Sequence, residues 1–225
     1  MVGSVNDPSF EYRVETIVSP PFEENTYVAH RRARRDCIVV DPGFLPDRII
    51  AYVEQNDLEP AAILNTHGHG DHIAGNAALK ERWPAVPLII GAGDAPLLTD
   101  PARNLSGMAG VRLISPPADQ TVQEGDVVSA AGFDLEVLEI PGHTQGHVVF
   151  VWKEATPTIV FGGDVLFAGS IGRFDFPGGN ERQLLEGIRT KLFRLPDDTL
   201  VYPGHGEPTT IGREKRWNPF VGQGG

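Results

Sequence analysis

The sequence contains only one cysteine, Cys37, among its 225 residues. A lone cysteine cannot form an intrachain disulfide, and nothing near Cys37 suggests an activated thiolate, so we expect a buried strand residue. The first residues, MVGSVNDPSFEYR, also lack the basic and apolar regions of a secretion signal. Both absences favour a reducing, cytoplasmic location.

Positive charge and long apolar runs are also scarce. Lys and Arg number 19 against 30 Asp and Glu, which gives a net charge of -11. An acidic surface repels nucleic acid, and no apolar run is long enough to cross a membrane, so neither is an expected partner. The exception is the basic run Arg31–Arg35. We interpret it as a solvated hairpin tip, with an anion site as the alternative.

No Ser- or Gly-rich linker divides the chain, so we expect a single α/β domain over residues 1–225. Alternating or continuous apolar patterns predict strands at residues 10–19, 25–30, 37–43, 60–66, 86–91, 127–132, 133–141, 147–152, 158–163 and 199–204. Helical spacing predicts helices at residues 46–58, 73–84, 94–100, 180–195 and 209–217. Asn180 is the expected N-cap of the fourth helix. Residues 99–118 are expected to form a loop.

The segment NTHGHGDHIAG, residues 65–75, concentrates three of the seven histidines after an expected strand. Residues two apart in extended backbone point the same way, so His67 and His69 can bind one ion together. The intervening glycines would remove bulk and let the backbone bend. Asp71 and His72 would face a second ion. Imidazole and carboxylate without thiolate suit zinc, iron or manganese, whereas a polar turn capped by Asp71 is the alternative.

Three more metal-type ligands follow apolar strands elsewhere in the chain: His143, Asp164 and His205. Loops at the carboxyl ends of strands converge in α/β folds, so we expect these side chains to meet the first cluster. His30 lies in the basic hairpin and is expected at the surface. His147 precedes an apolar strand, and we expect it to be hydrogen-bonded in support of the ligands or in the core rather than to be a ligand.

In this order the motifs resemble those of the metallo-β-lactamase superfamily: THGHGDH at 66–72, PGHT at 141–144, GGD at 162–164 and PGHG at 203–206. The resemblance extends to ENTY at 24–27, VVDPG at 39–43 and GREKRWNPF at 212–220. Within the superfamily, LFAGSIGRFDFPGG at 166–179 is most similar to the short bacterial hydrolases that resemble glyoxalase II, a hydroxyacylglutathione hydrolase. The implied fold is an αββα four-layer sandwich of two mixed sheets flanked by helices.

The resemblance also implies a ligand set for two divalent metal ions, with zinc as the first choice and iron or manganese as alternatives. The first site would comprise His67, His69 and His143, and the second Asp71, His72 and His205. Asp164 would bridge both ions. A metal-bridging hydroxide would then attack a small-molecule thioester such as S-acylglutathione, with Asp71 and Asp164 as catalytic residues. Asp41 would either support a ligand or only close its turn.

Arg173 matches the position at which such enzymes carry a basic residue for the glutathione moiety. Asp175 stands where an aromatic residue assists in those enzymes, and an internal ion pair between the two is the alternative role for Arg173. Only about twenty residues follow His205, so the C-terminal helical domain of full-length glyoxalase II is expected to be absent. Secreted β-lactamases fit less well because they carry a signal peptide.

Two further functions remain open on the sequence. A mononuclear iron persulfide dioxygenase of the same superfamily shares these histidines and needs only two of them with one carboxylate. A cysteine commonly follows the PGHT turn in that branch, where this chain has His147, so the sequence favours a hydrolase. A metal-stabilised scaffold without catalysis is the third reading, and it fits poorly because structural zinc sites usually contain thiolates.

Overall fold

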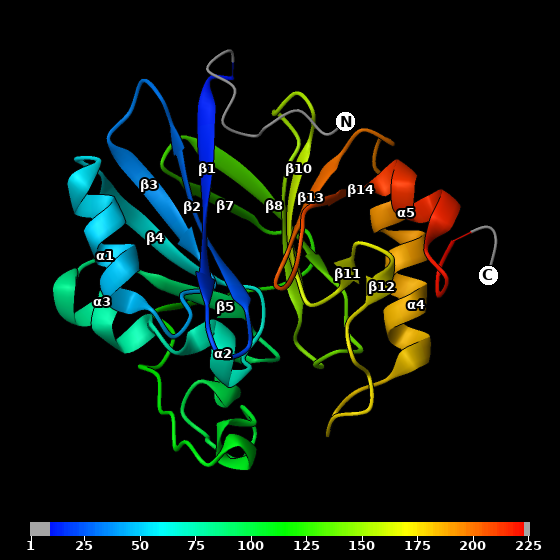
Figure 1. The fold of residues 1–225 in the computed structure, drawn as a ribbon, viewed down its shortest axis with the longest axis horizontal. Helices are drawn as coiled ribbons and strands as arrows, with labels where there is room; N and C mark the ends of the chain where they lie inside the picture. The colour runs from blue at the N-terminus through cyan, green and yellow to red at the C-terminus, as the bar shows by residue number, and fades with distance from the viewer. Residues whose placement is uncertain (1–9, 223–225) are drawn as a thin grey trace.

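A computed structural model describes residues 10–222 of the protein. Two six-stranded sheets face each other, and helices cover the outer face of each sheet (Figure 1). The expected αββα sandwich is therefore confirmed. Most of the N-terminal segment MVGSVNDPSFEYR falls in residues 1–9, which lie outside the described residues, so the expected lack of a secretion signal and the cytoplasmic location stay predictions.

The first sheet has the strand order β1-β2-β3-β4-β5-β6 and is mixed. Its first two pairings are antiparallel and the next three are parallel. The strands are β1 (Tyr12–Ser19), β2 (Glu24–Arg31), β3 (Asp36–Val40), β4 (Glu59–Asn65), β5 (Leu88–Gly91) and β6 (Gln120–Val122). Its outer face is covered by α1 (Pro46–Gln55) and α3 (Asn76–Arg82), whereas the short α2 (Gly70–Ile73) lies at one end of the sheet (Figure 1).

The second sheet has the order β14-β13-β10-β9-β8-β7 and pairs β10 with β13 in parallel. The strands are β7 (Val127–Ala130), β8 (Phe133–Glu139), β9 (Val148–Trp152), β10 (Ile159–Gly163), β13 (Leu200–Pro203) and β14 (Thr209–Thr210). It is covered by α4 (Glu181–Thr190) and α5 (Ile211–Trp217), and a small hairpin joins β11 (Leu166–Phe167) to β12 (Ser170–Ile171). Short 3₁₀ turns are η1 (Ala95–Leu97), η2 (Ser106–Ala109) and η3 (Leu192–Arg194).

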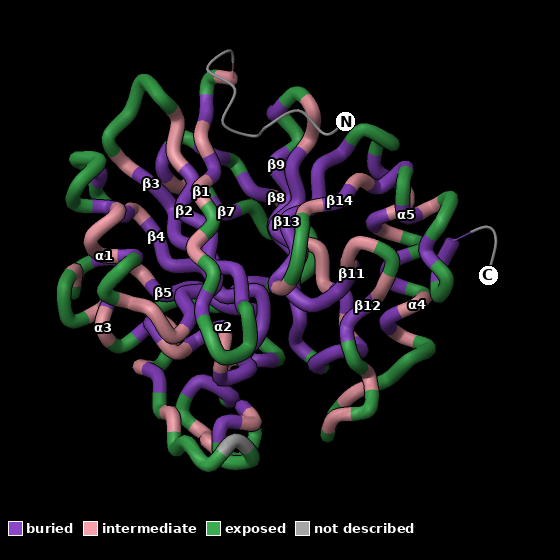
Figure 2. The backbone as a smooth tube through the Cα atoms, in the orientation of Figure 1, coloured by how far each residue is buried: buried purple, intermediate pink, exposed green. Residues whose placement is uncertain are grey.

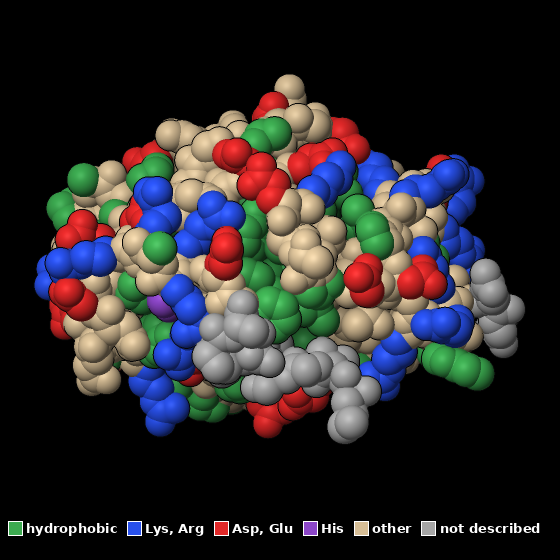
Figure 3. Space-filling model, turned by 90° about the horizontal axis from the view of Figure 1, so that it is seen from above, with side chains coloured by type: hydrophobic (Ala, Val, Ile, Leu, Met, Phe, Trp, Pro, Cys, Tyr) green, Lys and Arg blue, Asp and Glu red, His purple; other side chains and the backbone are tan. Residues whose placement is uncertain are grey.

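The strand β9 shows why the central strands are continuous apolar runs in the sequence. Phe150 and Trp152 pack into the layer between the sheets, whereas Val149 and Val151 pack into the layer under α4 and α5. A strand with both faces covered has no solvent side on which to place polar residues. Figure 2 accordingly shows the sheets as buried along most of their length. The face seen in Figure 3 carries acidic and basic side chains side by side.

Most expected elements are present, and the differences are local. The single helix expected over residues 73–84 is interrupted: α2 ends at Ile73 and α3 begins at Asn76. Gly75 lies between them, where an added Cβ would approach the backbone oxygen of Gly43 to 2.9 Å. The N-cap prediction is confirmed, because the Asn180 side chain accepts a hydrogen bond from the Gln183 backbone.

The basic run lies at the β2–β3 hairpin and is matched by carboxylates. Arg34 forms two hydrogen bonds of 2.7 Å to Asp36, and Arg35 pairs with Asp57. Because both guanidinium groups pair with carboxylates of the protein, these contacts favour a solvated hairpin tip over an anion site. His30 is only half-buried at the end of β2. Among the described residues, no helix has both the length and the apolar character needed to span a membrane.

Cys37 lies fully buried in β3, as expected. Burial raises the pKa of its thiol to about 12, and the neighbouring Asp36 adds to the effect. Near pH 8 the thiolate fraction would be about one in ten thousand. We therefore expect no reaction of the native protein with an aromatic disulfide reagent, and one equivalent of released thiol after unfolding. Rapid labelling of the native protein would contradict this burial.

Candidate metal centre

The predicted ligands come from the carboxyl ends of four strands. β4 leads to His67 and His69, β8 to His143, β10 to Asp164 and β13 to His205. Asp71 and His72 lie in α2, which starts directly after His69. These strand ends meet at the lower edge of the two sheets in Figure 1, around the label of α2. The structure thus brings all seven side chains to one place.

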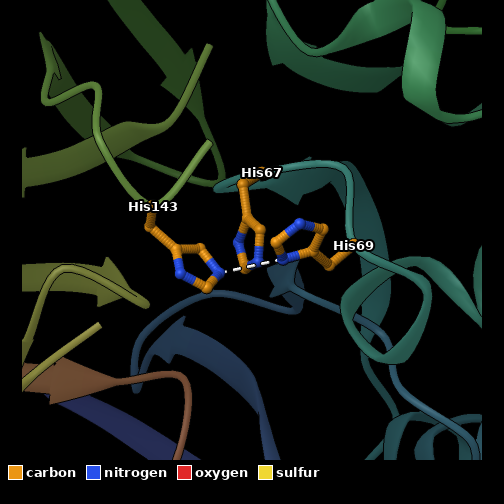
Figure 4. Close-up of side chains that lie close together, drawn as sticks. All are labelled: His67, His69 and His143. Atoms are coloured by element: carbon orange, nitrogen blue, oxygen red, sulfur yellow. Dashed lines mark hydrogen bonds between the residues drawn. The ribbon is translucent and has the colours of Figure 1, made fainter. Parts of the chain in front are cut away.

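Three histidines form the first group. The ligand nitrogens of His67, His69 and His143 lie within 4.8 Å of one another. The Nδ1 atom of His69 is 2.9 Å from Nε2 of His143, and Figure 4 shows all three rings directed toward a common point. The three side chains are buried, which limits the water that can compete for their nitrogens.

Asp71, His72 and His205 form the second group. The Nε2 atoms of His72 and His205 are 3.3 Å apart, and Asp71 Oδ2 is 3.4 Å from His205 Nε2. Two ligand nitrogens at tetrahedral positions around zinc would be about 3.3 Å apart. The separation in this group equals that value, and the His69–His143 separation is slightly shorter.

Asp164 lies between the two groups. Its Oδ2 atom is 3.4 Å from His143 Nε2 and 3.5 Å from His205 Nε2, while its Oδ1 atom is 3.5 Å from His72 Nε2. One carboxylate therefore faces nitrogens of both groups. Asp164 Oδ1 is also buried without a hydrogen-bond partner, a state that is costly unless a cation satisfies it.

The outer nitrogens of three histidines are held by acceptors. Nδ1 of His143 is 2.7 Å from the Arg173 carbonyl, and Nδ1 of His205 is 3.0 Å from the Phe22 carbonyl. A carbonyl only accepts, so each Nδ1 carries the proton and each Nε2 directs a lone pair inward. His72 Nδ1 similarly lies 3.1 Å from Asp41 Oδ2. Such outer contacts are typical of histidines that bind metal.

A relay through Thr66 fixes His67. The Thr66 hydroxyl donates to Asp41 Oδ2 at 2.6 Å, so it can only accept from His67 Nδ1, which lies 3.1 Å away. The inward Nε2 atom of His67 is buried without a partner. Asp41 Oδ1 also accepts from the Thr66 backbone at 2.7 Å. Asp41 thus orients His67 and His72. Of its two expected roles, supporting a ligand and only closing its turn, the contacts fit the first.

Asp41 lies close enough to His67 and His72 to form a third candidate group. Its oxygens are already engaged by Thr66 and by the outer nitrogen of His72, so we assign it a supporting role. The backbone of Asp41 has a φ of 48°, in the left-handed region that few residues other than glycine adopt. Such local strain is found where a turn must present a functional side chain.

The ionisation of the cluster favours cation binding. Burial and the neighbouring imidazoles lower the pKa values of His67 and His69 well below the usual range, which keeps both neutral. Burial alone would raise the pKa of Asp71, but the facing His72 and His205 lower it overall. For His72 the effect of burial is the opposite, because burial lowers the pKa of an imidazole. The carboxylates of Asp71 and Asp164 nevertheless raise the pKa of His72 well above the usual range. The carboxylates that favour a proton there also favour a metal cation.

His147 has the supporting position expected of it. Its Nε2 atom accepts the backbone N–H of Asp164 at 3.0 Å, and its ring stacks on His67 at a centroid distance of 4.8 Å. It therefore positions one candidate ligand and packs against another. Gly163 before Asp164 has a φ of +47°, and a Cβ there would come within 2.2 Å of the Thr66 hydroxyl.

Sequence reasoning missed Asp94. This buried carboxylate accepts from Gly68 N–H at 3.0 Å, from the Thr144 hydroxyl at 2.6 Å and from Gly146 N–H at 2.8 Å. It ties the loop that carries His67 and His69 to the loop that carries His143, across the two sheets. In the sequence Asp94 looks like the start of a short helix, so no local signal distinguishes it.

Gly68 and Gly70 serve close packing. Neither has a positive φ, so the expected backbone bend requires no conformation reserved for glycine. A Cβ on Gly68 would come within 2.5 Å of Leu97 Cβ, and one on Gly70 within 3.1 Å of Ser106 Cβ. The absence of side chains lets the loop of residues 92–118 lie against the metal-binding motif.

A pocket of about 460 Å³ opens over the cluster. Its floor contains candidate ligands from both groups, and its walls come from the β1–β2 and β3–α1 loops, the segment between β5 and β6, the β11–β12 hairpin and the β12–α4 loop. The lining residues are Phe22, Phe44, His69, Gly70, Asp71, Asn104, Leu105, Ser106, Met108, Val111, His143, Asp164, Phe167, Arg173, Phe176 and His205. Arg173, predicted to contact substrate, is exposed in this wall and pairs with Asp175 through Nε and Nη2 at 2.9 and 2.8 Å.

The family model described as "Metallo-beta-lactamase superfamily" matches residues 20–205. Among curated proteins, the chain is 39% identical to the probable metallo-hydrolase YqgX of Bacillus subtilis, over 82% of this chain and 87% of the relative. It is also 39% identical to the hydroxyacylglutathione hydrolase GloC of Haemophilus influenzae, over 83% of this chain and 88% of the relative.

Solved structures agree with the fold. The BLEG-1 B3 metallo-beta-lactamase superposes with a TM-score of 0.88 at 34% identity, covering 92% of this chain and 99% of that chain. TTHA1623 in a di-iron-bound form gives 0.80 at 36% identity, covering 92% and 100%. ETHE1 from Myxococcus xanthus gives 0.77 at 30% identity, covering 92% and 84%.

The Asp94 clamp can be tested directly. In Asp94→Asn the amide nitrogen would face at least one N–H or hydroxyl donor that now has an acceptor. We expect zinc affinity, measured by competition with a chromophoric chelator, to fall about 10–100-fold, the range for residues that orient ligands. The exposed Asp197→Asn serves as the matched control and should bind zinc like the parent. Unchanged affinity in Asp94→Asn would rule out the clamp.

Proposed function

The chain belongs to the metallo-beta-lactamase superfamily, whose members are mostly metal-dependent hydrolases, and we propose that this protein is a dinuclear thioester hydrolase. Its substrates would be S-acyl thiols such as S-acylglutathione. The observation that carries the proposal is the position of Asp164, which faces nitrogens of both ligand groups at 3.4–3.5 Å. The similarity to GloC supports the thioester class.

In this proposal each group would hold one divalent cation, and Asp164 would be the ligand common to both. The first site is His67, His69 and His143, and the second is Asp71, His72 and His205. Bound there, the two cations would lower the pKa of a shared water toward neutrality and stabilise negative charge on the substrate carbonyl oxygen. Zinc suits the imidazole and carboxylate donors, and iron remains a candidate because TTHA1623 has a di-iron-bound form.

The protein's own residues orient the reaction. Asp71 lines the pocket with its side chain about one-fifth exposed, so its carboxylate can orient an attacking water. Asp41, Thr66 and His147 keep the ligands oriented. A thiol leaving group has a pKa of about 8.5 and departs as thiolate. The absence of a further acid among the pocket's described lining residues therefore fits thioester chemistry.

We propose that Arg173 contacts an anionic thiol carrier. Asp175 engages Nε and Nη2 of the guanidinium, and an arginine has further N–H donors on its Nη1 group that can bind a carboxylate. The guanidinium also lies 4.0 Å from the centroid of the Phe176 ring, which fixes its plane at the pocket wall.

A mononuclear iron persulfide dioxygenase is the second candidate. The similarity to ETHE1 gives it some weight. It would use two histidines and one carboxylate around a single iron. Oxygen consumption with glutathione persulfide, without thioester turnover, would favour it over the hydrolase.

The first test concerns metal content. Elemental analysis after metal supplementation should give about two transition-metal ions per chain. Asp164→Asn should lose metal from both groups and nearly all thioester turnover, because an amide is neutral and a poorer ligand. The exposed Asp134→Asn should keep both properties. A persistent single iron in the parent, or both ions with most of the rate in Asp164→Asn, would overturn the dinuclear assignment.

The second test concerns the carrier. Arg173→Ala should raise KM for a glutathione thioester about tenfold, the value of one charged hydrogen bond, and should barely change KM for a neutral thioester. Asp175→Asn removes the competing carboxylate and should lower KM for the glutathione thioester alone. Equal losses on both substrates, with a lower melting temperature, would assign Arg173 to structure. A cephalosporin belongs in the same panel, because BLEG-1 is a metallo-beta-lactamase.

A further inference from the structure

The pocket walls indicate which acyl group the enzyme accepts. Resting on the proposed thioester hydrolysis, we infer that the acyl group is apolar, such as a medium-length alkyl chain. It lies in a groove formed by Phe22, Phe44, Leu105, Met108 and Val111, which we term the acyl groove.

Several apolar side chains of the acyl groove remain exposed. Met108 is 73% exposed, and Phe22 and Val111 are each 46% exposed. Large apolar side chains that share one exposed surface beside a reactive centre indicate a binding site. Phe22 and Phe44 contact each other with ring centroids 5.9 Å apart, so they form a continuous apolar wall.

The segment that carries Leu105, Met108 and Val111 is held in place by its own hydrogen bonds. The Asn104 carbonyl accepts from Gly70 N–H at 2.8 Å, next to the candidate ligand Asp71. The Asn104 amide donates to the Leu113 carbonyl, and Leu113 N–H donates to the Ser106 hydroxyl. The loop that presents Met108 and Val111 is therefore tied to the metal-binding motif.

These hydrogen bonds also leave few polar groups for the substrate. Asn104 and Ser106 are the uncharged polar side chains among the pocket's described lining residues. Asn104 Oδ1 accepts from Ser106 N–H at 3.0 Å, and its Nδ2 donates to Leu113. Both polar atoms of the Asn104 side chain are thus engaged within the loop, so a hydroxyl on the acyl chain would lose its water without gaining Asn104 as a partner, whereas an alkyl chain loses no polar contact.

The two ends of the pocket differ in character, which orients the substrate. The Phe22 carbonyl accepts a hydrogen bond from His205 Nδ1, and the Arg173 carbonyl accepts one from His143 Nδ1. Figure 1 draws the loop of residues 99–118 and the loop of residues 172–180 on opposite sides of the strand ends. The acyl chain would occupy the Phe22 side, and the thiol carrier would extend toward Arg173.

The experiment compares straight-chain thioesters of one neutral thiol, N-acetylcysteamine, from acetyl to octanoyl, with lactoyl as the polar member. For the metal-loaded parent, kcat/KM should rise about two- to fourfold per methylene; fourfold corresponds to 0.8 kcal/mol per fully buried CH₂. Titration calorimetry with the matching S-alkyl thioethers, which are not hydrolysed, should show affinity rising with chain length in the same way.

The variants Met108→Ser and Phe22→Ser should each lower the octanoyl-to-acetyl ratio about fivefold or more in turnover and in binding. Ile114→Ser is the matched control, because Ile114 is 60% exposed on the same loop and is absent from the pocket lining. It should keep the parent's ratios. Melting temperatures should stay close to the parent, since the changed side chains are exposed.

The outcomes separate the two proposals. Hydrolysis of acetyl and lactoyl thioesters at least as fast as octanoyl, with no chain-length effect on binding, would overturn the acyl groove and leave thioester hydrolysis standing. Chain-length-dependent binding without any thioester turnover would support the groove and overturn the hydrolase. Chain-length effects that persist unchanged in Met108→Ser and Phe22→Ser would overturn the assignment of the groove.

Discussion

The structure depends on one electrostatic constraint: five imidazoles and two carboxylates converge at the junction of two sheets. His67 Nε2 and Asp164 Oδ1 are buried there without protein partners. Such atoms are unfavourable in a protein interior unless a cation satisfies them. The outer contacts of His72, His143 and His205 direct their remaining nitrogens to the same region. The cluster is therefore built to bind cations.

The two sheets can meet at this point because backbone and side-chain hydrogen bonds join their strand ends. The Val148 N–H donates to the Thr66 carbonyl, and the Asn25 N–H donates to the Gly204 carbonyl, both at 2.8 Å. Asp94 adds a third connection between the sheets. A ligand set divided between two sheets needs these connections, since a small relative shift would separate His69 from His143. Packing in the aromatic core supports the same alignment, as between Tyr27 and Tyr202 with centroids 5.2 Å apart.

The sequence predicted the strands and helices with strong apolar periodicity, and it predicted which side chains would meet. His143, Asp164 and His205 could be found because each follows an apolar strand, and strand ends converge. It missed β6, β11, β12 and β14, whose two or three residues carry no periodic signal. Asp94 and the acyl groove were also missed, because their roles depend on contacts between segments distant in the chain. The left-handed backbone of Asp41 is likewise imposed by its tertiary contacts.

X-ray diffraction at the absorption edge of the metal bound by the purified protein tests the dinuclear site most directly. Two cations held by the two ligand groups should give two anomalous peaks about 3.5–4 Å apart. Each peak would lie about 2.0–2.3 Å from the ligand atoms of its own group, with Asp164 contacting both. A single peak in metal-saturated crystals, or a peak coordinated by Asp41 in place of Asp164, would contradict the central claim.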